Sequence, residues 1–179
     1  MEETTRTIAL SRARLKAMAP ACAIALASGI GLCAHARDDA VVTPALDQAV
    51  GLLAILFGAA CGLYLLRKLV DRRPGLVLTP LGLTDNSSGV ATGFVPWEDI
   101  AGVEARELMG QRMLVFHLVD IEKYLRRHGV PMRLIARANV ALCGSPLVIA
   151  PHVLAIEFDE LQRVVGEFRA RAPASTRAG

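Results

Sequence analysis

Two uncharged apolar stretches near the N-terminus constrain this chain more than any other feature of its sequence. They cover residues 17–36 and 48–66. A helix rises about 1.5 Å per residue, so each stretch is long enough to span the roughly 30 Å hydrocarbon core of a bilayer. They also account for a composition that is 53% hydrophobic but only 4% aromatic. The sequence therefore predicts a hairpin of two transmembrane helices.

The charges around the two stretches predict their orientation. Four basic residues precede the first stretch and four follow the second, whereas the connecting segment 37–47 holds one Arg and three Asp. Lys and Arg concentrate in cytoplasmic segments, so we expect residues 1–16 to be a basic cytoplasmic N-terminus and segment 37–47 to be a periplasmic loop. The predicted location is the bacterial inner (plasma) membrane, with a multi-pass chain and both termini in the cytoplasm.

A cleaved signal peptide is an alternative reading of the first stretch. A basic region leads into small apolar residues there, and Ala34-His35-Ala36 resembles an A-x-A cleavage site. The apolar region is longer than the ~7–15 residues usual in signal peptides, which favours a retained span. The basic residues after position 66 keep the rest of the chain in the cytoplasm in either case. Cleavage would therefore change only the number of anchors.

The cysteines and glycines of the spans indicate packing rather than chemistry. Three cysteines lie in the spans and one lies further along the chain, namely Cys22, Cys33, Cys61 and Cys143. The sequence contains no C-x-x-C pair, so it indicates neither a zinc site nor a redox motif. Gly58 and Gly62 form a G-x-x-x-G pattern, a spacing that lets two helices approach closely. The pattern fits the first span or a second copy of the chain, so a homodimer through the transmembrane helices stays open.

The segment after the hairpin has the pattern of a small α+β domain. A polar juxtamembrane linker over residues 67–74 leads into this domain, for which we expect the bounds 75–172, and residues 173–179 are expected to be a disordered tail. Alternating apolar residues between turn residues predict strands, over residues 76–79, 81–84, 93–97, 100–107 and 112–119. The last of these is apolar on both faces, which predicts an interior strand.

The second half of this domain combines helices with further strands. Asp120 as N-cap and Gly129 as a stop predict a two-turn helix over residues 120–128. Short strands are expected around residues 132–135, 139–142 and 146–156. Apolar residues then recur every three to four positions and predict a final amphipathic helix over about 159–171. Asp159 followed by Gln162 fits a capping box at its start.

Four stretches together resemble a known family. They are GLVLTPLGLTDNSS at 75–88, VPWEDI at 95–100, the helical insert at 120–128 and SPLVIAPHVLAIEFDELQRVVGEF at 145–168. In this order, after two N-terminal spans, they resemble an uncharacterised family of small bacterial inner-membrane proteins with a PH-like (pleckstrin-homology-like) cytoplasmic domain. The resemblance implies a two-helix transmembrane hairpin plus a partly open β-barrel, capped by a C-terminal amphipathic helix and carrying a short helical insertion.

The same resemblance implies where particular side chains point. Trp97 and Ile100 would face the packed side of the sheet, whereas Glu98 and Asp99 between them would face water. The core anchors expected on this plan are Trp97, Ile100, Phe116, Leu161 and Phe168.

No residue pattern in the sequence indicates catalysis. The chain has no P-loop, no G-x-S-x-G elbow, no H-E-x-x-H and no G-x-G-x-x-G motif. Glu98 and Asp99 lack a predicted partner that would shift one pKa for acid–base work. The four histidines are scattered at positions 35, 117, 128 and 152. We therefore expect a protein that is not an enzyme, with no catalytic residues, no metal site and no cofactor.

Two binding functions remain open. The first is recruitment of an unknown protein partner through an exposed strand edge or the open end of the barrel, helped by the high effective concentration that membrane tethering provides. The second is contact with anionic lipid through a basic patch around the inserted helix, made of Lys123, Arg126, Arg127, Arg133 and Arg137. A solvated helix face explains the same charges, and we favour that simpler reading.

Two ligand classes are not expected. Phosphoinositide-binding relatives hold phosphate with Lys and Arg near the first strand pair, but this chain has neither between Arg73 and Arg106. The part after residue 66 balances 15 basic against 12 acidic residues and has few aromatic side chains. Nucleic acid is therefore not an expected partner.

Overall fold

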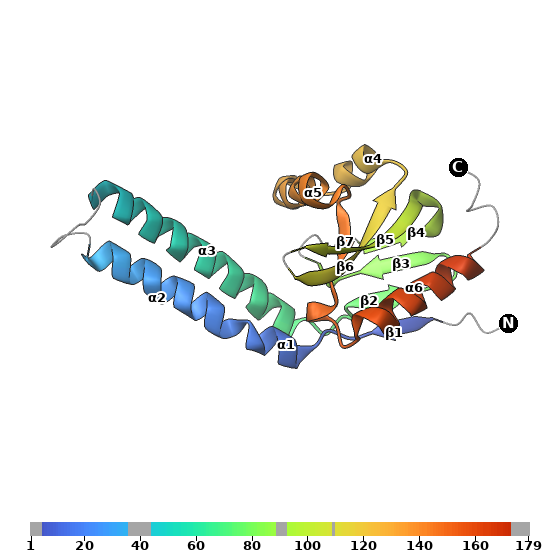
Figure 1. Cartoon of the computed structure of the whole chain (residues 1–179), viewed down its shortest axis with the longest axis horizontal. Helices are drawn as coiled ribbons and strands as arrows, with labels where there is room; N and C mark the ends of the chain where they lie inside the picture. Colours follow the sequence, from blue (N-terminus) through green and yellow to red (C-terminus); the bar gives the residue numbers. More distant parts are fainter. Residues whose placement is uncertain (1–4, 36–43, 89–92, 109, 173–179) are drawn as a thin grey trace. The chain divides into compact units, whose positions relative to one another are not determined.

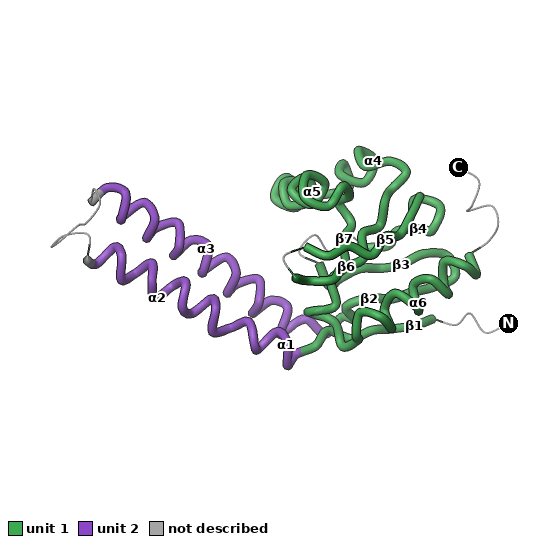
Figure 2. The backbone as a smooth tube through the Cα atoms, in the orientation of Figure 1, with its two compact units in different colours: residues 1–11, 73–179 green, residues 12–72 purple. Residues whose placement is uncertain are grey.

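The computed structural model describes residues 5–35, 44–88, 93–108 and 110–172. It divides into two compact units, residues 1–11 with 73–179 and residues 12–72 (Figure 2). Most of the predicted periplasmic loop and the whole predicted tail lie outside the described residues. The two units are therefore described one after the other.

The smaller unit is a helical hairpin. Its helices are α1 (Arg12–Ala17), α2 (Ala19–His35) and α3 (Pro44–Val70). The segments 12–34 and 45–70 are long and apolar enough to cross a membrane. Within the most apolar 18 residues of each segment, only 6% and 17% of the residues are buried. A core helix of a soluble protein would be mostly buried, so the prediction of two long apolar helices is confirmed. The helix α3 ends at Val70, so the first four residues of the expected juxtamembrane linker 67–74 are helical.

Glycines allow the two long helices of this hairpin to pack closely. A Cβ atom on Gly29 would lie 2.7 Å from the carbonyl oxygen of Gly51, and one on Gly58 would lie 2.8 Å from Cγ of Leu26. By contrast, no atom of the described residues lies within 4 Å of a Cβ on Gly62. Gly58 thus packs against α2 of the same chain. A homodimer through these helices stays a prediction.

The first sheet of the larger unit contains a strand that the sequence analysis missed. It has the order β1-β2-β3-β4 and is antiparallel throughout, with strands at Arg6–Ile8, Leu76–Leu78, Gly82–Asp85 and Gly93–Pro96. Part of the expected basic N-terminus is therefore a strand of the domain. Thr7 pairs with Val77, and Ile8 is only 4% exposed within the core.

Further hydrogen bonds hold the residues after β1 in the same domain. The backbone N–H of Gly75 donates to the carbonyl of Ile8 at 2.9 Å. The N–H of Ser11 donates to Val153, and the N–H of Ala155 donates to the carbonyl of Ala9. Residues 6–11 are thus bonded both to β2 and to the chain near residue 154. The domain is built from two parts of the sequence, one on each side of the hairpin (Figure 1).

A tight turn and a close approach position the next strands of this sheet. The N–H and hydroxyl of Thr79 both donate to the carbonyl of Gly82 at 2.9 Å, which leaves Pro80 and Leu81 at the tip of a β-turn between β2 and β3. A Cβ on Gly82 would lie 2.3 Å from the carbonyl oxygen of Val95 on β4. Only glycine fits where these two strands meet.

The second sheet has the order β5-β6-β7 and is also antiparallel. Its strands are Ile100–Leu108, Gln111–Leu118 and Leu147–Ile149. Strand β6 lies between the other two, which confirms the predicted interior strand. Its alternate residues Leu114 and Phe116 join the main core, whereas Met113 and Val115 pack with Cys143 on the opposite face. Two buried faces explain why this strand is apolar on both faces from Met113 to Phe116.

Three helices complete the unit, with 3-10 turns η1 (Trp97–Asp99) and η2 (Pro151–Val153). The helices are α4 (Ile121–Arg126), α5 (Val130–Cys143) and α6 (Phe158–Arg171). Asp120 caps α4 as predicted. The strands expected at 132–135 and 139–142 are wrong because this stretch is the helix α5. Pro131 lies in its first turn, where proline is tolerated, and Gly144 ends it with φ of 77°.

The last part of the chain differs from expectation in two details. Within 146–156 only Leu147–Ile149 forms a strand, and a single bridge joins Leu10 to Leu154. The N-cap of α6 is Glu157, and it makes no side-chain capping hydrogen bond. The capping box expected from Asp159 and Gln162 is therefore wrong.

The main core lies between the sheets and the inner face of α6 (Figure 1). All five expected anchors are buried there, with Trp97 2% exposed and its indole N–H donating to the carbonyl of Thr79 at 2.9 Å. The two sheets share no strand pairing among the described residues. An α+β domain with two antiparallel sheets is confirmed, and its closure into a PH-like barrel stays a prediction.

Candidate functional site

The polar turn after β3 satisfies its own hydrogen bonds. Asp85 is almost fully buried, and its Oδ1 accepts from the N–H of Ser87 at 2.8 Å and from its hydroxyl at 2.6 Å. The hydroxyl of Ser88 donates to Oδ2 of the same carboxylate at 2.5 Å. The two neighbouring serines therefore solvate a buried aspartate, as in an Asx-turn. Both serine hydroxyls are thus engaged with the Asp85 carboxylate.

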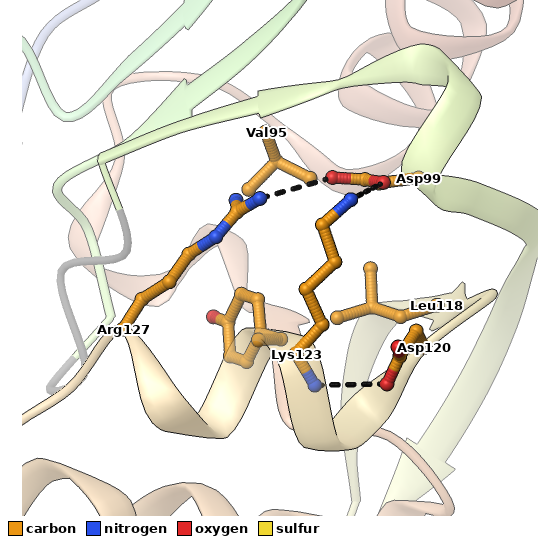
Figure 3. A pocket seen from close by; sticks show the side chains of 7 residues that line it. Val95, Asp99, Leu118, Asp120, Lys123 and Arg127 are labelled. Atoms are coloured by element: carbon orange, nitrogen blue, oxygen red, sulfur yellow. Dashed lines mark hydrogen bonds and ion pairs between the residues drawn. The ribbon is translucent and has the colours of Figure 1, made fainter.

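An ion-pair cluster joins the end of η1 to α4. Lys123 Nζ lies 2.9 Å from Asp99 Oδ1, and Arg127 Nη2 lies 3.5 Å from Asp99 Oδ2 (Figure 3). The backbone N–H of Lys123 donates to Asp120 Oδ1 at 2.8 Å. The Asp99 side chain is 22% exposed and is paired with both cations, so it does not face water in the way expected. Glu98 beside it is exposed, as expected.

A small hollow lies beside this cluster. Its volume of about 10 Å³ has room for about one water molecule, and Val95 and Leu118 are among the residues that line it (Figure 3). Tyr124 lines it as well. Pockets for small organic ligands usually measure roughly 300–1,000 Å³. The charges at its rim are balanced, because two carboxylates lie there with two cations, namely Asp99, Asp120, Lys123 and Arg127. The hollow therefore offers neither the size nor the unbalanced charge of a substrate site.

The structure divides the basic patch expected around this helix. Lys123 and Arg127 are paired with Asp99, and Arg133 Nη2 donates to the carbonyl of His128 at 3.2 Å. Arg126 and Arg137 are exposed and have no ion pair with any residue in the described part of the chain. The five residues therefore do not form one uncommitted cationic surface, and only Arg126 and Arg137 point their full charge at solvent.

The histidines of the domain have ordinary partners. His117 Nε2 lies 2.9 Å from Glu104 Oε2, and this hydrogen bond, helped by the nearby Arg106 guanidinium, holds the pKa of Glu104 below its ordinary value. His128 Nδ1 lies 3.0 Å from the carbonyl oxygen of Tyr124. Over residues 5–35, 44–88, 93–108 and 110–172, no three His, Cys, Asp or Glu side chains are grouped to hold a metal ion.

The most unusual surface of the domain is the outward side of α5. Val130, Leu134 and Leu142 are 78%, 71% and 65% exposed, and Ala138 and Ala141 beside them are exposed as well. We call these five residues the α5 apolar stripe. The sequence analysis missed it because the stretch was interpreted as two strands. The spacing of four residues between positions 130, 134 and 138 was the signal that could have revealed it.

Comparisons of this chain with protein families, with curated proteins and with solved structures find no match. The family resemblance therefore stays an expectation. What the protein does must be inferred from the described residues and their geometry.

Proposed function

We propose that this chain is a non-enzymatic, membrane-anchored interaction module. Its hairpin crosses the bacterial inner membrane twice and holds a PH-like domain at the cytoplasmic face, where the domain binds a protein partner. The polar groups described above are engaged in turns and ion pairs, and this supports a binding role rather than catalysis.

The pairing of β1 with β2 carries this proposal. β1 precedes the hairpin in the sequence and β2 follows it, yet both belong to one hydrogen-bonded sheet. Two paired strands must lie in the same compartment, so a hairpin between them must cross the membrane an even number of times. Basic residues flank the hairpin on both sides, which favours the cytoplasm for this compartment.

The same pairing argues against cleavage of the first span. A cut after residue 36 would separate β1 from the domain and remove Ile8 from the core. It would also remove the hydrogen bonds between residues 9–11 and the segment near residue 154. We therefore propose that the N-terminal segment is retained and that both spans act as anchors.

Short connections confine the domain to the membrane surface. Residues 9–11 join β1 to α1, and residues 71–75 join α3 to β2. Since an extended chain reaches at most about 3.5 Å per residue, the strand ends at which the domain is attached stay within about 20 Å of the hairpin ends. This confinement raises the effective concentration of a weak binder toward any partner in or on the same membrane.

The outer edge of β4 is the surface that we assign to a protein partner. In the described part of the sheet, β4 pairs with β3 on one side only, and its Phe94 side chain is exposed. An edge strand offers backbone groups that a segment of another protein can pair with, and an exposed aromatic residue adds a contact for its side chains.

Site-specific photo-cross-linking in cells tests this assignment. A photoreactive phenylalanine at position 94 of the full chain is expected to give a discrete cross-linked product of higher mass. The same residue at exposed Gln162 on α6 serves as the matched control and is expected to give none. Equal yields at both positions, or no product from position 94, would remove the support for a partner at this edge.

A second candidate function is contact with anionic lipid at the membrane surface. The α5 apolar stripe and the two uncommitted arginines, Arg126 and Arg137, favour it over the simple solvated helix face expected from sequence.

A further inference from the structure

We propose that α5 is an interfacial helix whose apolar stripe inserts among the headgroups of an anionic bilayer. This inference rests on the second candidate function and specifies its site and its ligand, the surface of the same membrane that holds the hairpin. No pocket is required, because the helix itself is the binding element.

The distribution of side chains around α5 differs from that in an ordinary surface helix, because apolar residues lie on its outward side as well as its inward side. Its inward side carries the buried Ala136 and Cys143 together with the half-buried Met132, Asn139 and Val140. The larger apolar residues of the stripe lie on the outward side. A surface helix of a soluble domain normally places polar residues there, so the exposed stripe indicates an apolar environment outside the protein.

The inward contacts of α5 fix this orientation. Ala136 packs with Leu125 of α4, and Cys143 packs with Met113 and Val115 of β6. Asn139 Nδ2 donates to the carbonyl of Pro146 at 3.3 Å, and Arg106 Nη1 donates to the carbonyl of Cys143 at 3.1 Å. With its inward side held by these groups, α5 cannot turn its stripe toward the core.

The charges beside the stripe match an anionic surface. α5 contains no acidic residue, and Glu122 is the one acidic residue in the range 121–143. Arg137 borders the stripe, one helical turn from Leu134 and from Ala141, and Arg126 lies on the neighbouring helix. An apolar face bordered by arginines is typical of helices that lie in the headgroup region of anionic membranes.

Tethering favours lipid over protein as the occupant of the stripe. The two short connections keep the attachment points of the domain close to the hairpin, so a surface that is both apolar and anionic is present at high effective concentration. The α5 helix of a second copy of the chain would offer these arginines no acidic residue to pair with, whereas an anionic bilayer surface does.

Depth measurements on the full chain test the proposal. A nitroxide label is attached to L134C, in a chain whose native cysteines are replaced, and the protein is placed in nanodiscs of phosphatidylglycerol and phosphatidylethanolamine in a ratio of about one to three. The label is expected to be accessible to oxygen and protected from an aqueous paramagnetic reagent, at a depth of about 5–10 Å. Labels at Q162C and F57C are the aqueous and hairpin controls.

A second arm tests the role of the arginines. In nanodiscs of phosphatidylcholine alone, or after R126Q together with R137Q, the ratio of inserted to aqueous label at position 134 is expected to fall. The expected fall is about fivefold for each charge lost. An unchanged ratio under both conditions would overturn the assignment to an anionic surface.

The remaining outcomes separate this inference from the proposed function. If the label at 134 is as aqueous as that at 162, or is shielded from oxygen and the aqueous reagent alike, the bilayer is not the occupant of the stripe. A lipid-exposed label at F57C would then still support the anchored module. If the label at F57C is aqueous, the anchoring fails and the docking of α5 fails with it.

Discussion

Replacing Ile8 by Glu is expected to destabilise the α+β domain by about 3 kcal/mol or more, since it buries a carboxylate without a partner. This result is expected although the whole hairpin separates Ile8 from the rest of the domain in sequence. Ile8 is 4% exposed and packs in the main core. Thermal unfolding of the full chain in detergent, followed by fluorescence of the single tryptophan, measures the effect. For a domain of this size a loss of 3 kcal/mol lowers the Tm by more than about 10 °C.

The neighbouring residue provides the matched control for this substitution. Thr7 lies on the same strand but is exposed, so Thr7→Glu is expected to change the free energy of unfolding by less than about 0.5 kcal/mol. Equal Tm values for the Ile8 and Thr7 variants would show that β1 is not part of the domain core.

Replacing Trp97 by Ala is expected to cost about 3–5 kcal/mol, because it leaves a large cavity in the core. It also removes the indole N–H that bonds the carbonyl of Thr79. Trp97→Phe keeps most of the ring and loses the hydrogen bond, for which we expect a smaller cost of about 1–2 kcal/mol. Since the variants lack the fluorescent reporter, limited proteolysis against denaturant concentration is the appropriate measurement.

The residue next to Trp97 again provides a control. Glu98 is exposed on the same 3-10 turn, so Glu98→Ala is expected to leave the midpoint of proteolysis nearly unchanged. A Trp97→Ala variant as resistant as Glu98→Ala would contradict the assignment of Trp97 as a core anchor.

The parts of the fold that sequence predicts well are those with a strong local signal. The long apolar helices follow from length and hydropathy, and the strand at 111–118 follows from apolar residues on both faces. β1 has no such signal, because it is three residues long and its partner lies beyond the hairpin. Only the tertiary pairing of Thr7 with Val77 makes it a strand.

The helix α5 was missed for a different physical reason. Its sequence has helical spacing but was interpreted as two short strands, whereas Pro131 lies in the first turn and Gly144 is the C-cap of one helix. Its apolar residues also face outward. A prediction that assumes that apolar residues are buried in the protein core therefore assigns the outward-facing apolar residues of α5 to the wrong element.

The candidate site shows the same limit of sequence reasoning. Five basic residues close together in sequence predict one patch, yet Asp99 neutralises Lys123 and Arg127 from a different element. Such a pairing depends on how η1 meets α4 in space. The uncommitted charges and the α5 apolar stripe become visible only when these contacts are known.

The central claim is that a membrane hairpin is inserted between two strands of one cytoplasmic sheet. Single cysteines at T7C and at Q162C, in chains without native cysteines, test it by reaction with a membrane-impermeant maleimide. In intact spheroplasts both positions are predicted to stay unlabelled, and both are predicted to react after permeabilisation. Labelling of one position but not the other in intact spheroplasts would place β1 and α6, which belong to the two parts of the domain, on opposite sides of the membrane and contradict the account.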